Sequence, residues 1–240
     1  MSYIVKFEDI GLSDYKKTWD YQAEIFKKLI ENKISGKDNS DSENPLIAGV
    51  LIFVEHPHVY TLGKSGSEDN LLIDNIQLNA KNAVFYRTDR GGDITYHGPG
   101  QIVGYPVFDL GILRIGLKEY ISRLEEAVIR TIREYGLEGK RMEGRTGVWL
   151  NSGIEGKERK ICAIGVKASR FITMHGFAFN VNTDLNYFNY INPCGFTDKG
   201  VTSLENETGT EQDIEHVKSI LKENIRDLFD LVWQKHINNG

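Results

Sequence analysis

The spacing of apolar positions along the chain predicts both helices and strands. Apolar residues recur at intervals of three and four over 13–33, 117–135 and 213–236, which is typical of amphipathic helices. Short apolar or alternating runs predict strands over 3–7, 46–54, 83–87, 102–109, 147–150, 160–166 and 172–182. We expect the first strand to lie at a sheet edge and Ser13 to cap the first helix.

Because helices and strands are mixed along the chain, the order predicts an α/β (α+β) fold, in which helices flank a mixed β-sheet. The 240 residues are enough for one domain with a substantial core. The segment 35–44 is polar and has almost no side chains that a core could bury, so we expect it to be a mobile surface loop.

Composition narrows the classes of function. The net charge of −5 argues against a nucleic-acid-binding protein, and no apolar run is long enough to cross a membrane. The first residues do not resemble a signal peptide, so we expect a cytoplasmic protein. With two cysteines, Cys162 and Cys194, the chain has neither a disulfide framework nor a cysteine-rich zinc site.

Three candidate motifs are rejected. Gly63-Lys64-Ser65 lacks the earlier glycine of a phosphate-binding loop, because that position is His58. Gly98 and Gly100 begin a dinucleotide pattern that fails at Val103 and is followed by a strand. His56 and His58 have no metal-ligating partners at suitable spacing, so we expect a packing role for both.

The segment RGGDITYHGPGQ, residues 90–101, is the first candidate site. Its glycines allow a ligand to approach the backbone closely, and exposed N–H groups in such a segment can bind an anion or oxyanion. A loop of β-turns between two strands is the alternative interpretation.

The two thiols differ in their surroundings. Cys162 stands in an apolar strand, where strand alternation places it on one face with Lys160 and Ile164, and we interpret it as a core residue. Cys194 stands between a proline and a glycine and is the better candidate nucleophile, which a nearby lysine ammonium would activate. A turn residue without a role is the alternative for Cys194.

Four blocks, RGGDITYHGPGQ, RKICAIGVK, HGFAFNVN and INPCG, resemble in that order the octanoyltransferases of lipoate biosynthesis, the lipoyl(octanoyl) transferase or lipoate-protein ligase B family. The resemblance covers about residues 50–205. It implies the fold of the biotin/lipoate protein ligase catalytic domain, with residues 1–240 forming a single octanoyltransferase domain.

The resemblance also implies the reaction. An octanoyl group passes from octanoyl-acyl carrier protein to a lysine of a lipoyl domain, in the E2 subunits of 2-oxoacid dehydrogenases or the glycine cleavage H protein. Cys194 would form the acyl-thioester intermediate, and Lys160 would lower the pKa of its thiol. The resemblance implies no metal and no other cofactor. The sequence shows no exposed heptad pattern, so we expect a monomer, and its charge and apolar runs lead us to expect no nucleic-acid or membrane partner.

The substrate contacts of the family map onto three groups of residues. These are Arg90, Gly91, Gly92, Asp93, Ile94, Thr95, Tyr96 and His97, then Ala163, Ile164 and Gly165, then Gly176, Phe177 and Ala178. We expect Tyr96, Ile164 and Phe177 to line a tunnel for the acyl chain. The basic cluster at 157–170, with Arg141 and Arg145, is our candidate docking face for acidic partner proteins.

Three alternatives stay open. An ATP-dependent lipoate or octanoate ligase on the same fold would not require Cys194, and a non-catalytic acyl-binding module would require neither Cys194 nor Lys160. Lys167 and Arg170 form a second basic pair that could replace Lys160 as the activator.

Overall fold

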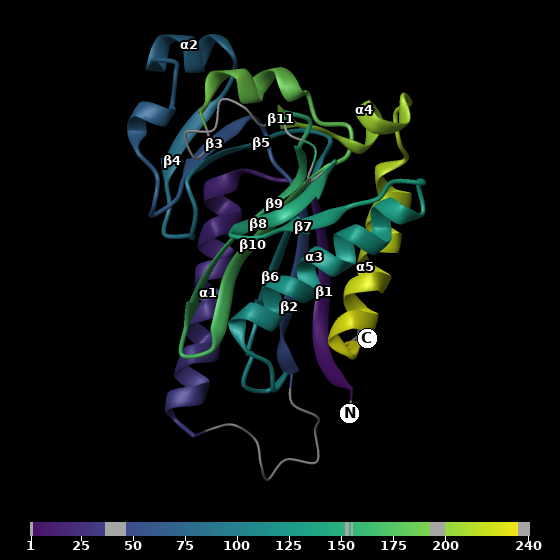
Figure 1. Ribbon diagram of the computed structural model, residues 1–240. Helices are drawn as coiled ribbons and strands as arrows, with labels where there is room; N and C mark the ends of the chain where they lie inside the picture. The colour runs from purple at the N-terminus through teal and green to yellow at the C-terminus, as the bar shows by residue number, and fades with distance from the viewer. Residues whose placement is uncertain (1, 37–46, 152–153, 155, 193–199, 235–240) are drawn as a thin grey trace, which may run out of the picture.

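A large mixed sheet organises the chain (Figure 1). The computed structural model describes residues 2–36, 47–151, 154, 156–192 and 200–234. Among these residues, nine strands form the sheet in the order β12-β1-β2-β6-β10-β9-β8-β7, and β11 pairs with β9. The strands are β1 (Tyr3–Leu12), β2 (Ile47–Glu55), β6 (Gln101–Phe108), β7 (Lys140–Met142), β8 (Arg145–Leu150), β9 (Arg159–Ser169), β10 (Ile172–Asn180), β11 (Gly200–Val201) and β12 (Leu231–Trp233).

Helices cover both faces of this sheet (Figure 1). On one face, α1 (Tyr15–Ile34) packs Phe26 with Val107 of β6 and Met174 of β10. On the other face, α3 (Leu117–Arg133) and α5 (Ile214–Phe229) bury their apolar sides in the largest core cluster. Every residue of β6 is buried, because this central strand is covered on both sides. The sequence-based prediction of a mixed sheet flanked by helices is therefore confirmed.

A smaller three-stranded sheet, of order β4-β3-β5, lies beside one end of the large sheet (Figure 1). Its strands are β3 (Val59–Leu62), β4 (Val84–Arg87) and β5 (Ile94–His97). It has its own core around Tyr60 and Tyr96, to which α2 (Asn75–Ala80) contributes Leu78. Two short helical turns, Glu68–Asn70 and Leu185–Tyr190, and the short helix α4 (Leu204–Thr208) complete the described elements.

Several sequence-based boundaries were wrong. The first strand runs to Leu12 and is not the edge, because β12 pairs with it in parallel, with Tyr3 opposite Leu231. The C-terminal helix ends at Phe229, since Asp230 adopts a left-handed conformation with φ of 54°. The residues that follow bury Leu231 as part of a strand rather than continuing the helix.

The cap of the first helix was also misplaced. The side chain of Asp14, not that of Ser13, accepts the hydrogen bond from the backbone N–H of Lys17, at 2.9 Å. The helix closes at Ser35, and most of the segment 35–44, predicted to be a mobile loop, lies outside the described residues. No helix in the described ranges is both long and apolar enough to span a membrane.

Candidate active site

A cavity of about 530 Å³ lies between the small sheet, the glycine-rich segment and strands β8, β9 and β10. Its size falls within the roughly 300–1,000 Å³ of typical small-molecule sites. Most of the predicted substrate-binding residues line it: Arg90, Gly91, Gly92, Asp93, Ile94, Thr95, His97, Ala163, Ile164, Gly165, Gly176, Phe177 and Ala178. Lys160 lines it as well, so the fold brings together blocks that lie far apart in the sequence.

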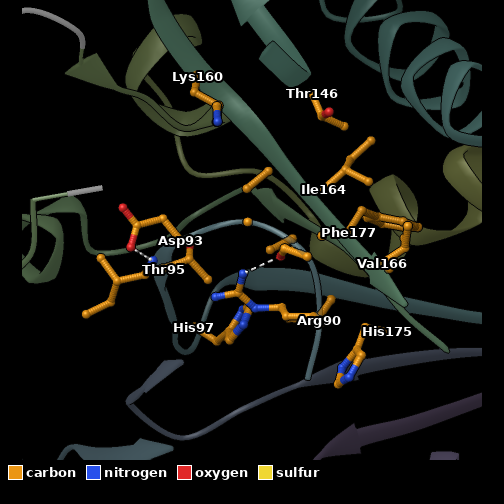
Figure 2. A pocket seen from close by; sticks show the side chains of 18 of the residues that line it. Arg90, Asp93, Thr95, His97, Thr146, Lys160, Ile164, Val166, His175 and Phe177 are labelled. Atoms are coloured by element: carbon orange, nitrogen blue, oxygen red, sulfur yellow. Dashed lines mark hydrogen bonds between the residues drawn. The ribbon is translucent and has the colours of Figure 1, made fainter. Parts of the chain in front are cut away.

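The cavity is elongated along β9. Near one end, the backbone N–H of Gly91 donates to the carbonyl oxygen of Val166 at 2.9 Å, which fixes the glycine-rich segment against the strand. Lys160 lies six residues from Val166 on the same strand, so the lysine and the glycine-rich segment contact the cavity at different points along β9. Figure 2 shows Lys160 apart from Arg90 and His97, with Ile164, Val166 and Phe177 along one side.

Arg90 holds the glycine-rich segment to the small sheet. Its guanidinium donates to the carbonyl oxygen of Thr61 at 2.6 Å, to the hydroxyl of Thr61 at 2.9 Å and to the carbonyl oxygen of Gly91 at 2.9 Å. A side chain at Gly63 would clash with this arrangement, because a Cβ there would lie 2.9 Å from the guanidinium. Arg90 therefore shapes the cavity wall through contacts within the protein itself.

His97 belongs to a buried polar network in the wall of the cavity. Its Nδ1 lies 2.8 Å from the side-chain oxygen of Gln101, whose amide nitrogen donates to the side-chain oxygen of Asn180 at 2.8 Å. Burial, reinforced by the neighbouring His56, lowers the pKa of His97 to about 3. His97 is therefore neutral at pH 7 and donates from Nδ1 to Gln101.

Tyr96 does not line the cavity, contrary to the prediction. The segment Ile94–His97 forms strand β5 rather than a loop, and strand alternation turns the ring of Tyr96 into the core of the small sheet. There its hydroxyl lies 2.7 Å from Nδ1 of His58, and its ring stacks on Tyr187. Ile164 and Phe177, the other two predicted tunnel residues, do line the cavity.

A β-bulge in β9 separates Lys160 from Cys162. Val148 of β8 pairs with Cys162, and the next residue, Trp149, pairs with Lys160, so Ile161 is the extra residue of the bulge. The prediction that Lys160 and Cys162 share one face was wrong, because the bulge interrupts the alternation of side chains. Lys160 lines the cavity, whereas Cys162 does not and is fully buried.

Cys162 is therefore a core residue, as predicted. Burial raises the pKa of its thiol well above the usual value, although the charge of Lys160 acts in the opposite direction. The other thiol, Cys194, lies outside the described residues, as does the rest of 193–199. After this segment the described chain lines the cavity at Gly200 and Val201, whereas Asn192, before it, is not among the lining residues. The backbone N–H of Asn192 donates to the carbonyl oxygen of Asn70. Val201 of β11 pairs with Lys160 of β9.

The other basic residues are distributed unevenly around the cavity. Arg145 lines it, but Arg141 is engaged by Glu125 at 3.2 Å and Glu126 at 2.9 Å. Lys167 pairs with Asp89, and Arg170 lies in the turn between β9 and β10. Neither Lys167 nor Arg170 is among the residues that line the cavity, which favours Lys160 over this pair.

Thr146, Trp149 and His175 are among the side chains that line the cavity and that the sequence-based prediction missed. Thr146 and Trp149 lie in the segment 144–150, GRTGVWL, and neither residue type indicates chemistry without a structure. In the part of the chain that the structure describes, no group of three or more histidine, cysteine or acidic side chains could hold a metal ion.

Comparisons with known proteins agree with this geometry. Residues 14–226 match the model of the lipoyl protein ligase A/B catalytic domain. The octanoyltransferase of Flavobacterium johnsoniae is 53% identical over 227 residues, which cover 94% of this chain and 97% of that protein. The octanoyltransferase of Cytophaga hutchinsonii is 49% identical over 235 residues, which cover 98% of this chain and 95% of that protein.

Solved structures show a similar fold. A bi-partite lipoate protein ligase from Thermoplasma acidophilum has a TM-score of 0.65 at 15% identity, over 98% of this chain and 86% of its own. A lipoate-protein ligase A bound with ATP has a TM-score of 0.65 at 13% identity, over 98% of this chain and 88% of its own. At such low identity, these structures establish the architecture and not the reaction.

Proposed function

This chain belongs to the lipoyl protein ligase A/B catalytic-domain family, and on that premise we propose that it is an octanoyltransferase of protein lipoylation. It transfers an octanoyl group from octanoyl-acyl carrier protein to a lysine of a lipoyl domain. The proposal follows from relatives named octanoyltransferase that are about half identical over nearly the whole chain. The acceptors would be lipoyl domains of E2 subunits and the glycine cleavage H protein, and residues 1–240 would act as one catalytic domain.

The observation that carries the proposal is the make-up of the cavity. One elongated site holds a lysine, an apolar wall of Ile164, Val166 and Phe177, and a glycine-rich segment. An eight-carbon chain requires an apolar wall, and a thioester carbonyl requires donors near its oxygen. Lys160 and the backbone N–H groups of the glycine-rich segments are the candidate donors.

Cys194 is the proposed nucleophile. Its thiolate attacks the octanoyl carbonyl carbon, a carbon–sulfur bond forms, and the bond to the carrier sulfur breaks. The carrier thiolate takes up a proton and leaves. In the second step the amine of the acceptor lysine attacks the acyl-enzyme, the amide bond forms, the amine loses a proton, and the Cys194 thiol is restored. Gly200 and Val201 support this assignment, because these described neighbours of the cysteine segment line the cavity.

Lys160 is the proposed activator of that thiol. A nearby ammonium stabilises the thiolate and so lowers the pKa of a cysteine. A site that works through a free thiol also needs a reducing compartment, which supports the proposed cytoplasmic location. We also propose that the protein is a monomer.

The docking face for acidic partner proteins is proposed around Arg145 and Lys157. Arg145 lines the cavity, so an acidic domain bound there would lie next to the site of transfer. Arg141 is a weaker candidate than the sequence indicated, since Glu125 and Glu126 already neutralise it.

Intact-mass spectrometry tests the proposed reaction directly. Wild-type protein incubated with octanoyl-acyl carrier protein, without ATP, should gain one octanoyl group that hydroxylamine removes. Cys194→Ser should abolish the adduct, and the matched variant Cys162→Ser should retain it. An adduct that persists in Cys194→Ser, or one that forms only when octanoate and ATP are supplied, would exclude this mechanism.

A further inference from the structure

The ammonium of Lys160 lies over the indole ring of Trp149. The distance from Nζ to the ring centroid is 4.6 Å, and the two residues are direct partners across strands β8 and β9. Trp149 is only 4% exposed, so its ring is held in place by packing, whereas Lys160 is partly exposed at the cavity wall. Indole is the aromatic side chain that attracts a cation most strongly.

The aliphatic part of Lys160 also lies close to Gly147 of β8. A Cβ at Gly147 would lie 3.6 Å from Cε of Lys160 and 2.4 Å from the carbonyl oxygen of Cys162. The lysine chain therefore passes within van der Waals distance of position 147, although the clash that a side chain there would make is with the backbone of Cys162. Gly147 is itself fixed, because its backbone N–H donates to the buried carboxylate of Glu125 at 2.9 Å.

We infer that Trp149 is a positioning residue for Lys160, whose ammonium it holds at the cavity wall. The inference rests on the proposed function, in which Lys160 acts on the thiol of Cys194. A lysine side chain is flexible, and the effect of its charge on a neighbouring thiolate falls with distance. By fixing the ammonium, Trp149 controls how strongly Lys160 activates the nucleophile.

The pH dependence of thiol alkylation tests this role. Iodoacetamide labelling of the Cys194-containing peptide is followed by mass spectrometry, so that Cys162 is not counted. Trp149→Leu should move the midpoint of labelling about 0.5–1 pH unit higher, because an ammonium that is no longer held in place stabilises the thiolate less. Trp149→Phe keeps a weaker aromatic face and should move it less, whereas Lys160→Ala should move it most.

Trp233→Leu is the matched control. Trp233 also lies near a lysine, with Nζ of Lys222 5.4 Å from its ring centroid, but it does not line the cavity. Its substitution should leave the labelling midpoint unchanged. If the thermal melt shows that Trp149→Leu does not fold, the labelling midpoint of Trp149→Phe is compared with that of the wild-type protein instead.

A double variant separates positioning from general disturbance. In a Lys160→Ala background, Trp149→Phe should have no further effect on the midpoint, because residues that act together are not additive. An equal shift in both backgrounds, or no shift in the wild-type background, would overturn the inference. The octanoyl adduct on Cys194 is a separate measurement. Its absence from the wild-type protein would overturn the proposed function, not the role of Trp149.

Discussion

Nε2 of His175 lies 2.8 Å from Oδ1 of Asp89, and the ammonium of Lys167 pairs with the other carboxylate oxygen. Burial lowers the pKa of His175, so the neutral ring donates from Nε2 to the carboxylate. This hydrogen bond, followed by that of Lys167, keeps the pKa of Asp89 well below its usual value. His175 has a φ of 62° inside β10, so the Asp89 contact helps to hold a strained backbone beside the cavity.

Removal of that carboxylate should destabilise the protein. Asp89→Ala leaves the buried N–H of His175 without its acceptor, and we expect a loss of about 1–3 kcal/mol in the free energy of unfolding. Urea denaturation at pH 7 measures it. Asp20→Ala is the control, because Asp20 makes an exposed ion pair with Lys16 that is worth about 0.5 kcal/mol or less. Equal losses for both variants would contradict the structural role of Asp89.

Two buried histidines should make stability depend on pH. Burial lowers the pKa of His56 to about 4 and that of His97 to about 3, below the unfolded value of about 6.5. Because the pKa values of both histidines are depressed in the folded state, the stability that their neutral forms contribute is present above pH ~6.5. It decreases as the pH falls below that value. In the range just below pH ~6, each histidine should lower the free energy of unfolding by about 1.4 kcal/mol for every pH unit of acidification.

Urea denaturation between pH 5 and 7 checks this slope. His97→Gln cannot titrate, so it should reduce the slope by about 1.4 kcal/mol per pH unit. The same slope in the variant and the wild-type protein would show that His97 is protonated in the folded state.

Glycine at position 147 should be much harder to replace than glycine at position 144. Both have positive φ, but a Cβ at Gly147 would lie 2.4 Å from the carbonyl oxygen of Cys162, and at Gly144 it would meet nothing within 4 Å. We expect Gly147→Ala to cost at least about 2–3 kcal/mol of stability and Gly144→Ala about 1 kcal/mol. Thermal or chemical denaturation measures both, and equal costs would contradict the close packing at β8.

Much of this architecture could be predicted from the sequence, because apolar spacing reports which residues are buried. The helices at α1 and α3 and the strands at β2, β6, β9 and β10 all follow from it. The glycine-rich segment was harder, since the alternation that makes Ile94–His97 a strand is masked by its glycines and polar residues. Strand β12 was missed because Leu231 and Val232 continue the helical spacing of α5.

The candidate site was predictable in its residue types and less so in its geometry. The conspicuous motifs identified Arg90 to His97 and Lys160, and these residues other than Tyr96 do line one cavity. The bulge at Ile161 leaves no mark in the sequence, yet it decides that Lys160 and Cys162 lie in different surroundings. Trp149 could not be predicted as a neighbour of Lys160, because that contact depends on pairing between two strands.

The parallel pairing of β12 with β1 moves the edge of the large sheet from β1 to β12 at this end. Without β12, the apolar residues Tyr3, Ile4 and Val5 would form an open strand edge, which is a template for the addition of another chain. Further along β1, the charged residues Lys6, Glu8 and Asp9 make the strand a poor partner for a second copy. The edge strand that remains, β12, is three residues long, and so short an edge offers few unpaired N–H and C=O groups to another chain.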